Sequence, residues 1–251
     1  MNTANGYAAL VTGAGSGIGR AVALRLAQDG ATVIAADLDL DAARAAADEA
    51  QALPGRLVPI AVDVADERSV AALFTEADRH VPALAALVNV AGIGSTTSVP
   101  DCSAEDWDRV FAVNARGAFL CSRAALARFL PAGAGTIVSV ASVAGLIGLR
   151  NRAAYCASKG ALIALTRAMA IDHVRDGIRV NCVCPGTVHT PWVDRLVHDA
   201  GESLDDLRAR QPMGRLGTPA EIADAVLYLL DDRAAFVTGS ALVIDGGLTA
   251  A

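Results

Sequence analysis

Tyr155 and Lys159 are the two side chains in this 251-residue chain whose types and spacing best suit acid–base chemistry. A separation of four residues places both on one face of a helix, one turn apart. A tyrosine with its ordinary pKa of about 10 is a poor base at neutral pH. A lysine ammonium nearby favours the phenolate and lowers that pKa. Ser142 adds a hydroxyl at the predicted end of a strand. Such Tyr–Lys pairs also occur on solvated helix faces. Whether this pair belongs to an active site therefore depends on the elements that position it.

A glycine-rich turn at residues 13–19 is the first of these elements. It follows an apolar run at 7–12 that predicts a buried strand, and it leads into a predicted helix over 20–29. A second strand over 32–36 ends on Asp37. This order of strand, glycine turn, helix, strand and acid is typical of a dinucleotide site. Glycines let the backbone approach a pyrophosphate, and the helix N-terminus offers N–H groups. The turn residues assigned to the cofactor are Gly13, Ser16, Gly17, Ile18 and Gly19.

Asp37 is predicted to select the cofactor. Its carboxylate would accept hydrogen bonds from the adenosine ribose hydroxyls and repel a 2′-phosphate. Neither Ser16 nor Leu38, the neighbouring positions that could offset this repulsion, is basic. The sequence therefore predicts NAD rather than NADP. The alternative is that Asp37 is an ordinary loop carboxylate.

The rest of the chain continues the alternation of strands and helices. The patterns predict helices over 41–50, 66–80, 103–130, 153–175 and 218–231, and strands over 57–62, 85–90, 136–141, 178–183 and 241–244. We expect an α/β fold, Rossmann-like and doubly wound, with one seven-stranded parallel sheet, helices on both faces and a single domain over residues 1–251. A polar helix predicted at 194–210, between Pro191 and Pro212, interrupts the alternation. We expect it to form a substrate lid at about 190–214.

Polar and small residues follow the predicted strands at the ends where a cofactor would bind. Asp63 and Val64 come after the third strand, where the carboxylate could meet the adenine amino group. Asn89, Ala91 and Gly92 come at the end of the fourth strand, where small residues let the backbone pass close to a cofactor. All five are assigned to the cofactor site.

Asn114 lies inside the apolar periodicity of the helix predicted at 103–130. A buried amide must find hydrogen-bonding partners. It is either a satisfied core residue or an anchor for water or backbone inside the site. At the start of this helix, Ser103 and Asp106 resemble a capping box with aspartate in place of glutamate.

Composition excludes several classes of protein. Hydrophobic residues make up 53% of the chain and charged residues 19%, enough for a large core. A formal charge of −6 argues against a nucleic-acid or anionic-membrane surface. No apolar run reaches the roughly 18 residues of a spanning helix, and residues 1–6 show no signal peptide. The four histidines and five cysteines show no metal-ligand spacing. We therefore expect a cytoplasmic protein with reduced thiols and no metal.

Taken together, these motifs resemble the classical short-chain dehydrogenase/reductase family over essentially the whole chain. The motifs on which the resemblance rests are Thr12-Gly13-xxx-Gly17-x-Gly19, Asp63, Asn89-x-Ala91-Gly92, Asn114, Ser142, Tyr155-xxx-Lys159, Pro185-Gly186 and Asp245-Gly246-Gly247. Val90 departs from the family, which commonly has a second asparagine there.

The resemblance implies catalytic roles for four residues. Tyr155 takes the hydroxyl proton during hydride transfer to the nicotinamide and returns it in reduction, while Ser142 hydrogen-bonds the reacting oxygen. Lys159 lowers the tyrosine pKa and binds the nicotinamide ribose, and Asn114 holds a water that relays the proton. The further cofactor residues implied by the family are Pro185, Gly186, Val188 and Thr190.

The segment at 181–191 resembles a branch that contains hydroxybutyrate and keto-deoxy sugar-acid dehydrogenases. In that branch arginines bind a substrate carboxylate, and Arg152, Arg195 and Arg210 have plausible counterparts here. His189 stands where that branch often has an acid. The alternative is that these are ordinary surface arginines.

The first functional hypothesis is an NAD-dependent dehydrogenase of a small hydroxy acid, sugar or sugar acid. A carrier-linked 3-oxoacyl reductase using NADPH, and a dinucleotide-binding regulator without turnover, are the alternatives.

Small residues along the helix at 153–175 suit close helix packing, and the family suggests a homotetramer.

Overall fold

Seven strands form one parallel sheet in the order β3-β2-β1-β4-β5-β6-β7. The computed structural model describes residues 7–199 and 203–251. The strands are β1 (Ala8–Thr12), β2 (Thr32–Asp37), β3 (Arg56–Ala61), β4 (Ala86–Asn89), β5 (Gly135–Val140), β6 (Ile178–Pro185) and β7 (Ala241–Ile244). The predicted seven-stranded parallel sheet is thus confirmed.

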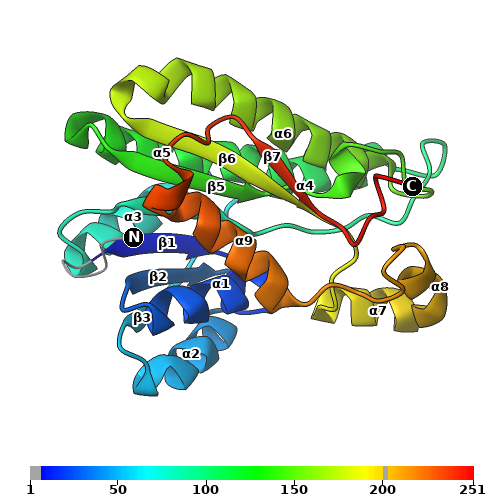
Figure 1. Ribbon diagram of the computed structural model, residues 1–251, viewed down its shortest axis with the longest axis horizontal. Helices are drawn as coiled ribbons and strands as arrows, with labels where there is room; N and C mark the ends of the chain where they lie inside the picture. The colour runs from blue at the N-terminus through cyan, green and yellow to red at the C-terminus, as the bar shows by residue number, and fades with distance from the viewer. Residues whose placement is uncertain (1–6, 200–202) are drawn as a thin grey trace.

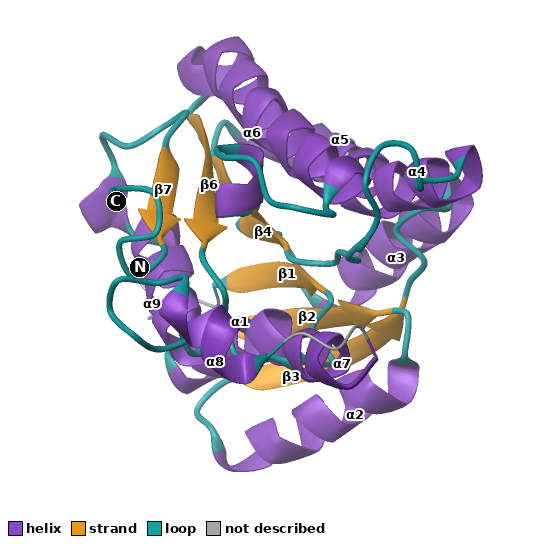
Figure 2. Cartoon of the chain, turned by 90° about the vertical axis from the view of Figure 1, so that its right-hand side faces the viewer, coloured by secondary structure: helices purple, strands orange, loops and turns teal. Residues whose placement is uncertain are grey.

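Helices cover both faces of the sheet (Figures 1 and 2). One layer contains α1 (Gly17–Gln28), α2 (Leu40–Glu49) and α9 (Pro219–Leu230). The other contains α3 (Glu67–His80), α4 (Ala104–Phe111), α5 (Ala118–Ala132) and α6 (Ala153–His173). The short helices α7 (Pro191–Asp199) and α8 (Leu204–Ala209) lie at the carboxyl ends of the strands, in front of the sheet in Figure 2.

The core follows from the alternation of side chains along each strand. In β1, Ala9 and Val11 pack with the α1 and α9 side chains, whereas Ala8 and Leu10 pack with those of α3 and α5. All four are essentially inaccessible to solvent. Because both faces are covered, the strands read as continuous apolar runs, as parallel strands in such folds do.

Two predicted helices differ from the structure. The helix expected at 194–210 is instead the pair α7 and α8, and residues 200–202 between them lie outside the described residues. Pro191 is the first residue of α7, because proline's missing N–H is no loss at that position. The helix expected at 103–130 contains a π-helical turn, η3 (Ala112–Gly117), between α4 and α5.

Side chains cap three of the helices, and the cap predicted at Ser103 differs in part from the prediction. Asp66 caps α3, and Thr218 forms a complete capping box at α9. Ser103 accepts a hydrogen bond from the Asp106 N–H at α4. The Asp106 carboxylate, however, accepts from Ser95 and Arg109, so the reciprocal half of that box is missing.

The sheet order reverses between β1 and β4, which is where such folds bind ligands. The Thr12 hydroxyl at the end of β1 accepts hydrogen bonds from the N–H groups of Val90 (3.1 Å) and Ala91 (3.2 Å). Gly13 has φ +67°, and a Cβ there would stand 3.0 Å from the Ala91 backbone. The glycine turn and the loop after β4 therefore form one wall of a crevice.

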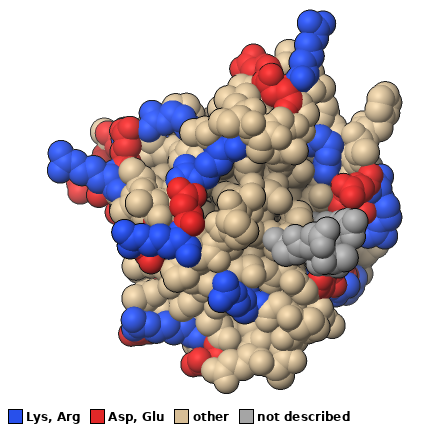
Figure 3. All heavy atoms as spheres, turned by 90° about the vertical axis from the view of Figure 1, so that its left-hand side faces the viewer, with Lys and Arg blue, Asp and Glu red and all other residues tan. Residues whose placement is uncertain are grey.

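The opposite end of the molecule, where the strands begin, carries charges of both signs. Figure 3 shows arginine side chains lying beside Asp and Glu side chains on this face. No helix within residues 7–199 and 203–251 is both long and apolar enough to cross a bilayer.

Candidate active site

A cavity of about 460 Å³ opens at the carboxyl ends of the central strands. It extends from the glycine turn to helices α7 and α8. The sequence-predicted residues that line it are Gly13, Ser16, Gly17, Ile18, Gly19, Ala91, Gly92, Ser142, Arg152, Tyr155, Lys159, Pro185, Gly186, Val188, Thr190, Arg195 and Arg210. Segments far apart in the chain thus meet in one space.

The glycine turn has the geometry of a phosphate cradle. Gly17 has φ +51°, and a Cβ on Gly19 would stand 2.0 Å from the Gly13 carbonyl oxygen, so both positions require glycine. Ser16 is the N-cap residue of α1, but its side chain makes no capping hydrogen bond. The first N–H groups of α1 therefore fit the pyrophosphate of a dinucleotide.

Asp37 lies beside this turn at the end of β2. Its carboxylate accepts hydrogen bonds from the N–H groups of Gly15 (2.7 Å) and Asp39 (3.0 Å). The next side chain, Leu38, is 75% exposed. A carboxylate fixed against the glycine turn and followed by a non-basic residue fits a ribose bearing free hydroxyls.

The other predicted residues at the adenine end have mainly local partners. Asp63 accepts a hydrogen bond from the Ala65 N–H, and its own N–H donates to the Ser69 hydroxyl. Val64 packs so closely against Gly117 that a Cβ there would stand 2.8 Å from the valine methyl. Of the site residues predicted from the sequence, six do not line the cavity: Asp37, Leu38, Asp63, Val64, Asn89 and Asn114.

Ser142, Tyr155 and Lys159 converge at the centre of the cavity. Ser142 follows β5, and its hydroxyl lies near enough to the phenol of Tyr155 to lower the tyrosine pKa. Tyr155 and Lys159 lie one turn apart in α6, with the Lys159 ammonium 5.7 Å from the centre of the tyrosine ring. Lys159 is buried, and its Nζ donates a hydrogen bond of 2.8 Å to the Val140 carbonyl. The geometry places an acid–base side chain, a hydroxyl donor and an amine within one small volume.

Burial displaces both pKa values toward the neutral forms of the side chains. Desolvation lowers the pKa of Lys159 from 10.5 to about 8. The pKa of Tyr155 is raised, because desolvation outweighs the Ser142 hydrogen bond and the positive charge of Arg152. The prediction that Lys159 brings the tyrosine pKa below its ordinary value is therefore wrong for this structure. The lysine hydrogen-bonds to a carbonyl and is itself desolvated.

Asn114 is an anchor for backbone, one of the two roles that its sequence position allowed. Its Oδ1 accepts from the Ile93 N–H (2.8 Å), and its Nδ2 donates to the Ile93 carbonyl (2.9 Å) and the Ser158 hydroxyl (3.0 Å). Ser158 in turn donates to the Tyr155 carbonyl. The π-helical turn that contains Asn114 thus links the loop after β4 to helix α6.

Asn89 is turned into the protein interior. Its Nδ2 donates to the hydroxyls of Ser122 (3.1 Å) and Ser139 (3.3 Å). Its buried Oδ1 has no hydrogen-bonding partner in the part of the chain that the structure describes. The side chain therefore joins β4 to α5 and β5, and any contact with a cofactor falls to the backbone.

Helices α7 and α8 close the other side of the cavity. Arg152, at the N-terminus of α6, is 6% exposed, whereas Arg195 in α7 and Arg210 after α8 are exposed. Gln211 is buried, and its side chain accepts from the Thr187 N–H (3.3 Å), which ties the end of α8 to the loop after β6. The three arginines thus face one space from two walls.

Sequence reasoning missed most of the apolar lining. The added residues include Val143, Leu149, Trp192, Leu196, Leu207 and Leu248. Trp192 follows Pro191 directly, within the predicted lid at about 190–214 but before the polar helix predicted at 194–210. The chain has two tryptophans, and this rarity was the one signal in the sequence that could have marked Trp192 as a site residue.

A parallel doubly wound sheet, a glycine turn at its switch point and a Ser–Tyr–Lys cluster together define a Rossmann-fold nicotinamide oxidoreductase. Comparison with known proteins agrees. A family model described as enoyl-(acyl carrier protein) reductase matches residues 13–249. The chain belongs to the short-chain dehydrogenase/reductase family.

Three relatives illustrate the similarity. The chain is 46% identical to 2-(S)-hydroxypropyl-CoM dehydrogenase 3 of Xanthobacter autotrophicus, over 96% of this chain and 95% of the relative. It is 41% identical to cyclohexanol dehydrogenase of an Acinetobacter species, over 99% and 97%. A solved short-chain type dehydrogenase/reductase from Mycobacterium marinum has a TM-score of 0.93 and 36% identity, covering 98% of this chain and 96% of that one. The chain is accordingly an oxidoreductase of CH–OH groups that uses a nicotinamide cofactor.

Proposed function

We propose that this protein is an NAD-dependent dehydrogenase that oxidises the secondary alcohol of a small hydroxy acid, sugar or sugar acid. One observation carries the proposal. Arg152, Arg195 and Arg210 line the same cavity as Ser142 and Tyr155. Guanidinium groups are the natural receptors of carboxylate and sulfonate groups, because they donate paired hydrogen bonds. A substrate held by these arginines would place its alcohol near the tyrosine.

The side chains of the cluster have separate roles in this proposal. Tyr155 accepts the alcohol proton, and Ser142 donates a hydrogen bond to the same oxygen. Lys159 carries a proton next to the tyrosine, and Asn114 fixes the backbone around a proton-relaying water. When bound, the nicotinamide supplies the carbon that receives the hydride.

The cofactor assignment rests on the glycine turn and Asp37. The remaining cofactor contacts come from the backbone at Ala91 and Gly92, the loop from Pro185 to Thr190, and Asp63 beside the adenine. Asp37 favours NAD, because a 2′-phosphate would meet a carboxylate already fixed by Gly15. The exposed Leu38 offers no charge to offset it.

Helices α7 and α8 are proposed to form the substrate lid. Both line the cavity, and the segment is held at its ends, since His189 N–H donates to Gly217 O across its two ends and Met213 N–H donates to Gly246 O after β7. The relatives' names point to two kinds of alcohol, a derivative of coenzyme M, which ends in a sulfonate, and the neutral cyclohexanol. The arginines favour the anionic kind.

The test is an NADH-production screen at alkaline pH across hydroxybutyrate, fucose, rhamnose, their aldonates, 2-hydroxypropyl-coenzyme M and cyclohexanol. An acetoacetyl thioester with NADH or NADPH is included to examine the carrier-linked alternative. Arg152→Ala should raise KM for an anionic substrate roughly 10- to 100-fold, the effect of a hydrogen bond to a charged group, and change it little for a neutral alcohol.

Arg150→Ala is the matched control, because Arg150 lies two residues away, is exposed and does not line the cavity. Turnover of neutral alcohols alone would remove the anionic substrate from the proposal. Dinucleotide binding without oxidation of any alcohol would instead favour the regulator.

The assembly is proposed to be a homotetramer. Exposed apolar side chains on α4, α5 and α6, including Trp107, Phe119 and Ile171, support association through these helices. Light scattering coupled to size exclusion would distinguish a tetramer from a dimer or monomer. The cytoplasmic location stays a prediction from the sequence.

A further inference from the structure

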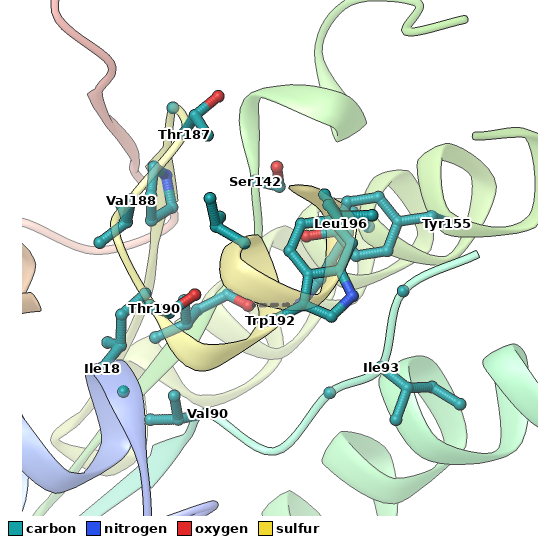
Figure 4. A pocket seen from close by; sticks show the side chains of 18 of the residues that line it. Ile18, Val90, Ile93, Ser142, Tyr155, Thr187, Val188, Thr190, Trp192 and Leu196 are labelled. Carbon is teal, nitrogen blue, oxygen red and sulfur yellow. Dashed lines mark hydrogen bonds between the residues drawn. The ribbon is translucent and has the colours of Figure 1, made fainter. Parts of the chain in front are cut away.

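Trp192 contacts both Tyr155 and Arg152, the residues proposed to bind the two ends of the substrate. Its ring stacks on that of Tyr155, with 5.9 Å between ring centres and 21° between ring planes. The Arg152 guanidinium carbon lies 5.9 Å from the centre of the indole. Figure 4 shows the indole against Tyr155, with Leu196 of the same helix nearby. The indole therefore packs against both the tyrosine ring and the buried arginine.

Gly94 holds the other edge of this indole. A Cβ on Gly94 would stand 2.3 Å from Cζ2 and 2.5 Å from Nε1 of Trp192, far inside contact distance. The backbone of Gly94 is not in the left-handed region, so its conformation alone does not require glycine. The glycine is needed to make room for the tryptophan. The loop after β4 and helix α7 are thus fitted to each other around the indole.

We propose that Trp192 is a specificity-determining residue whose indole limits the size of the groups attached to the carbinol carbon. The inference rests on the proposed function, because it takes Tyr155 as the group that accepts the alcohol proton. An indole is a large and rigid apolar surface. Stacked on Tyr155 and seated on Gly94, it restricts the space beside the tyrosine hydroxyl, so small alkyl groups enter and ring-sized groups are excluded.

The test compares two neutral alcohols that differ only in the size of one substituent, 2-butanol and 1-cyclohexylethanol. Neutral alcohols keep the measurement independent of the arginines. Trp192→Ala should raise the ratio of kcat/KM for the bulky alcohol to that for the small one at least tenfold, since one methylene in an apolar pocket discriminates about 10- to 200-fold. Trp192→Phe, which keeps a ring against Tyr155, should shift the ratio much less.

Gly94→Ala tests the same wall from the opposite side. Its methyl group would displace the indole without altering the tryptophan, so the ratio should move in the same direction as in Trp192→Ala. Phe236→Ala is the control for loss of an aromatic side chain. Phe236 is fully exposed and does not line the cavity. Melting temperatures of all variants show whether each has folded.

The outcomes separate the two proposals. A ratio that stays within twofold of the wild-type value in both Trp192→Ala and Gly94→Ala would overturn the role of Trp192, as would a wild-type preference for the bulky alcohol. A wild-type protein active only on neutral alcohols would remove the anionic substrate while leaving the role of Trp192 under test. A wild-type protein inactive on every alcohol would overturn both.

Discussion

The burial of Lys159 predicts that this lysine destabilises the protein that contains it. Lys159 is 4% exposed, and desolvation lowers its pKa from 10.5 to about 8. At about 1.36 kcal/mol per pKa unit, the charged lysine costs about 3 kcal/mol of folding free energy at neutral pH. Replacing it by methionine removes this cost but leaves the Val140 carbonyl without its donor, a loss of about 1 kcal/mol. Lys159→Met should therefore be more stable by about 2 kcal/mol at pH 7.

The sign of the pH dependence follows from the same shift. Below pH 8 the lysine is protonated in both the folded and the unfolded chain, so the full cost is present. Between pH 8 and 10.5 the folded chain has lost the proton and the unfolded chain still binds it, so stability rises with pH. Above 10.5 the cost has gone. The stability advantage of Lys159→Met should thus be largest at pH 7 and shrink steadily through this window.

The chain offers an unusually direct assay, because Lys159 is its only lysine. Protein grown with isotope-labelled lysine gives a single side-chain NMR signal, and its titration midpoint is expected near pH 8. Melting curves of wild type and Lys159→Met at equal concentration, at pH 7 and 9.5, measure the stability difference. A shift of roughly 2–4 °C per kcal/mol is expected for a domain of this size. A midpoint near 10.5, or a less stable variant at pH 7, would refute the reasoning.

Two further predictions concern the proposed reaction. Because burial raises the pKa of Tyr155, kcat/KM for alcohol oxidation should still be rising above pH 9. In the reverse direction, kcat/KM for reduction should stay level until the pH reaches the raised tyrosine pKa, and a flat oxidation profile would contradict this. Tyr155→Phe should lower both by about 10² to 10⁴. Replacing Asp37 by serine and Leu38 by arginine should shift the preference between NAD and NADP by about 100-fold toward NADP, measured as the ratio of kcat/KM values. An unchanged ratio would show that Asp37 does not select the cofactor.

The sequence predicted those parts of the fold that local chemistry determines. Strands such as β1 are buried on both faces, so their apolar runs stand out. Helix α9 begins with Thr218, Pro219 and Glu221, which together satisfy the first N–H groups of the helix. The glycine turn was recognisable because its positive φ angles and close approaches admit no other residue. In each case the cause lies within a few residues along the chain.

Features that depend on distant partners escaped prediction. The π-helical turn at 112–117 is not visible in the apolar pattern of the sequence, and hydrogen bonds between Asn114 and both Ile93 and Ser158 accompany it. The raised pKa of Tyr155 depends on desolvation by the surrounding fold, which a spacing of four residues does not reveal. Trp192 became part of the site only through its contacts with Gly94 and α6.

The pKa shifts of the cluster and its chemistry have one physical origin. Burial raises the pKa of Tyr155 and lowers that of Lys159, so both shifts favour the uncharged forms. A neutral tyrosine is ready to donate a proton, whereas oxidation needs the phenolate, which positive charge stabilises. Arg152 is one source of such charge, since it already lowers the tyrosine pKa. An anion bound to Arg152 would weaken that effect. The residue proposed to recognise the substrate therefore also acts on the proton equilibrium of the reaction.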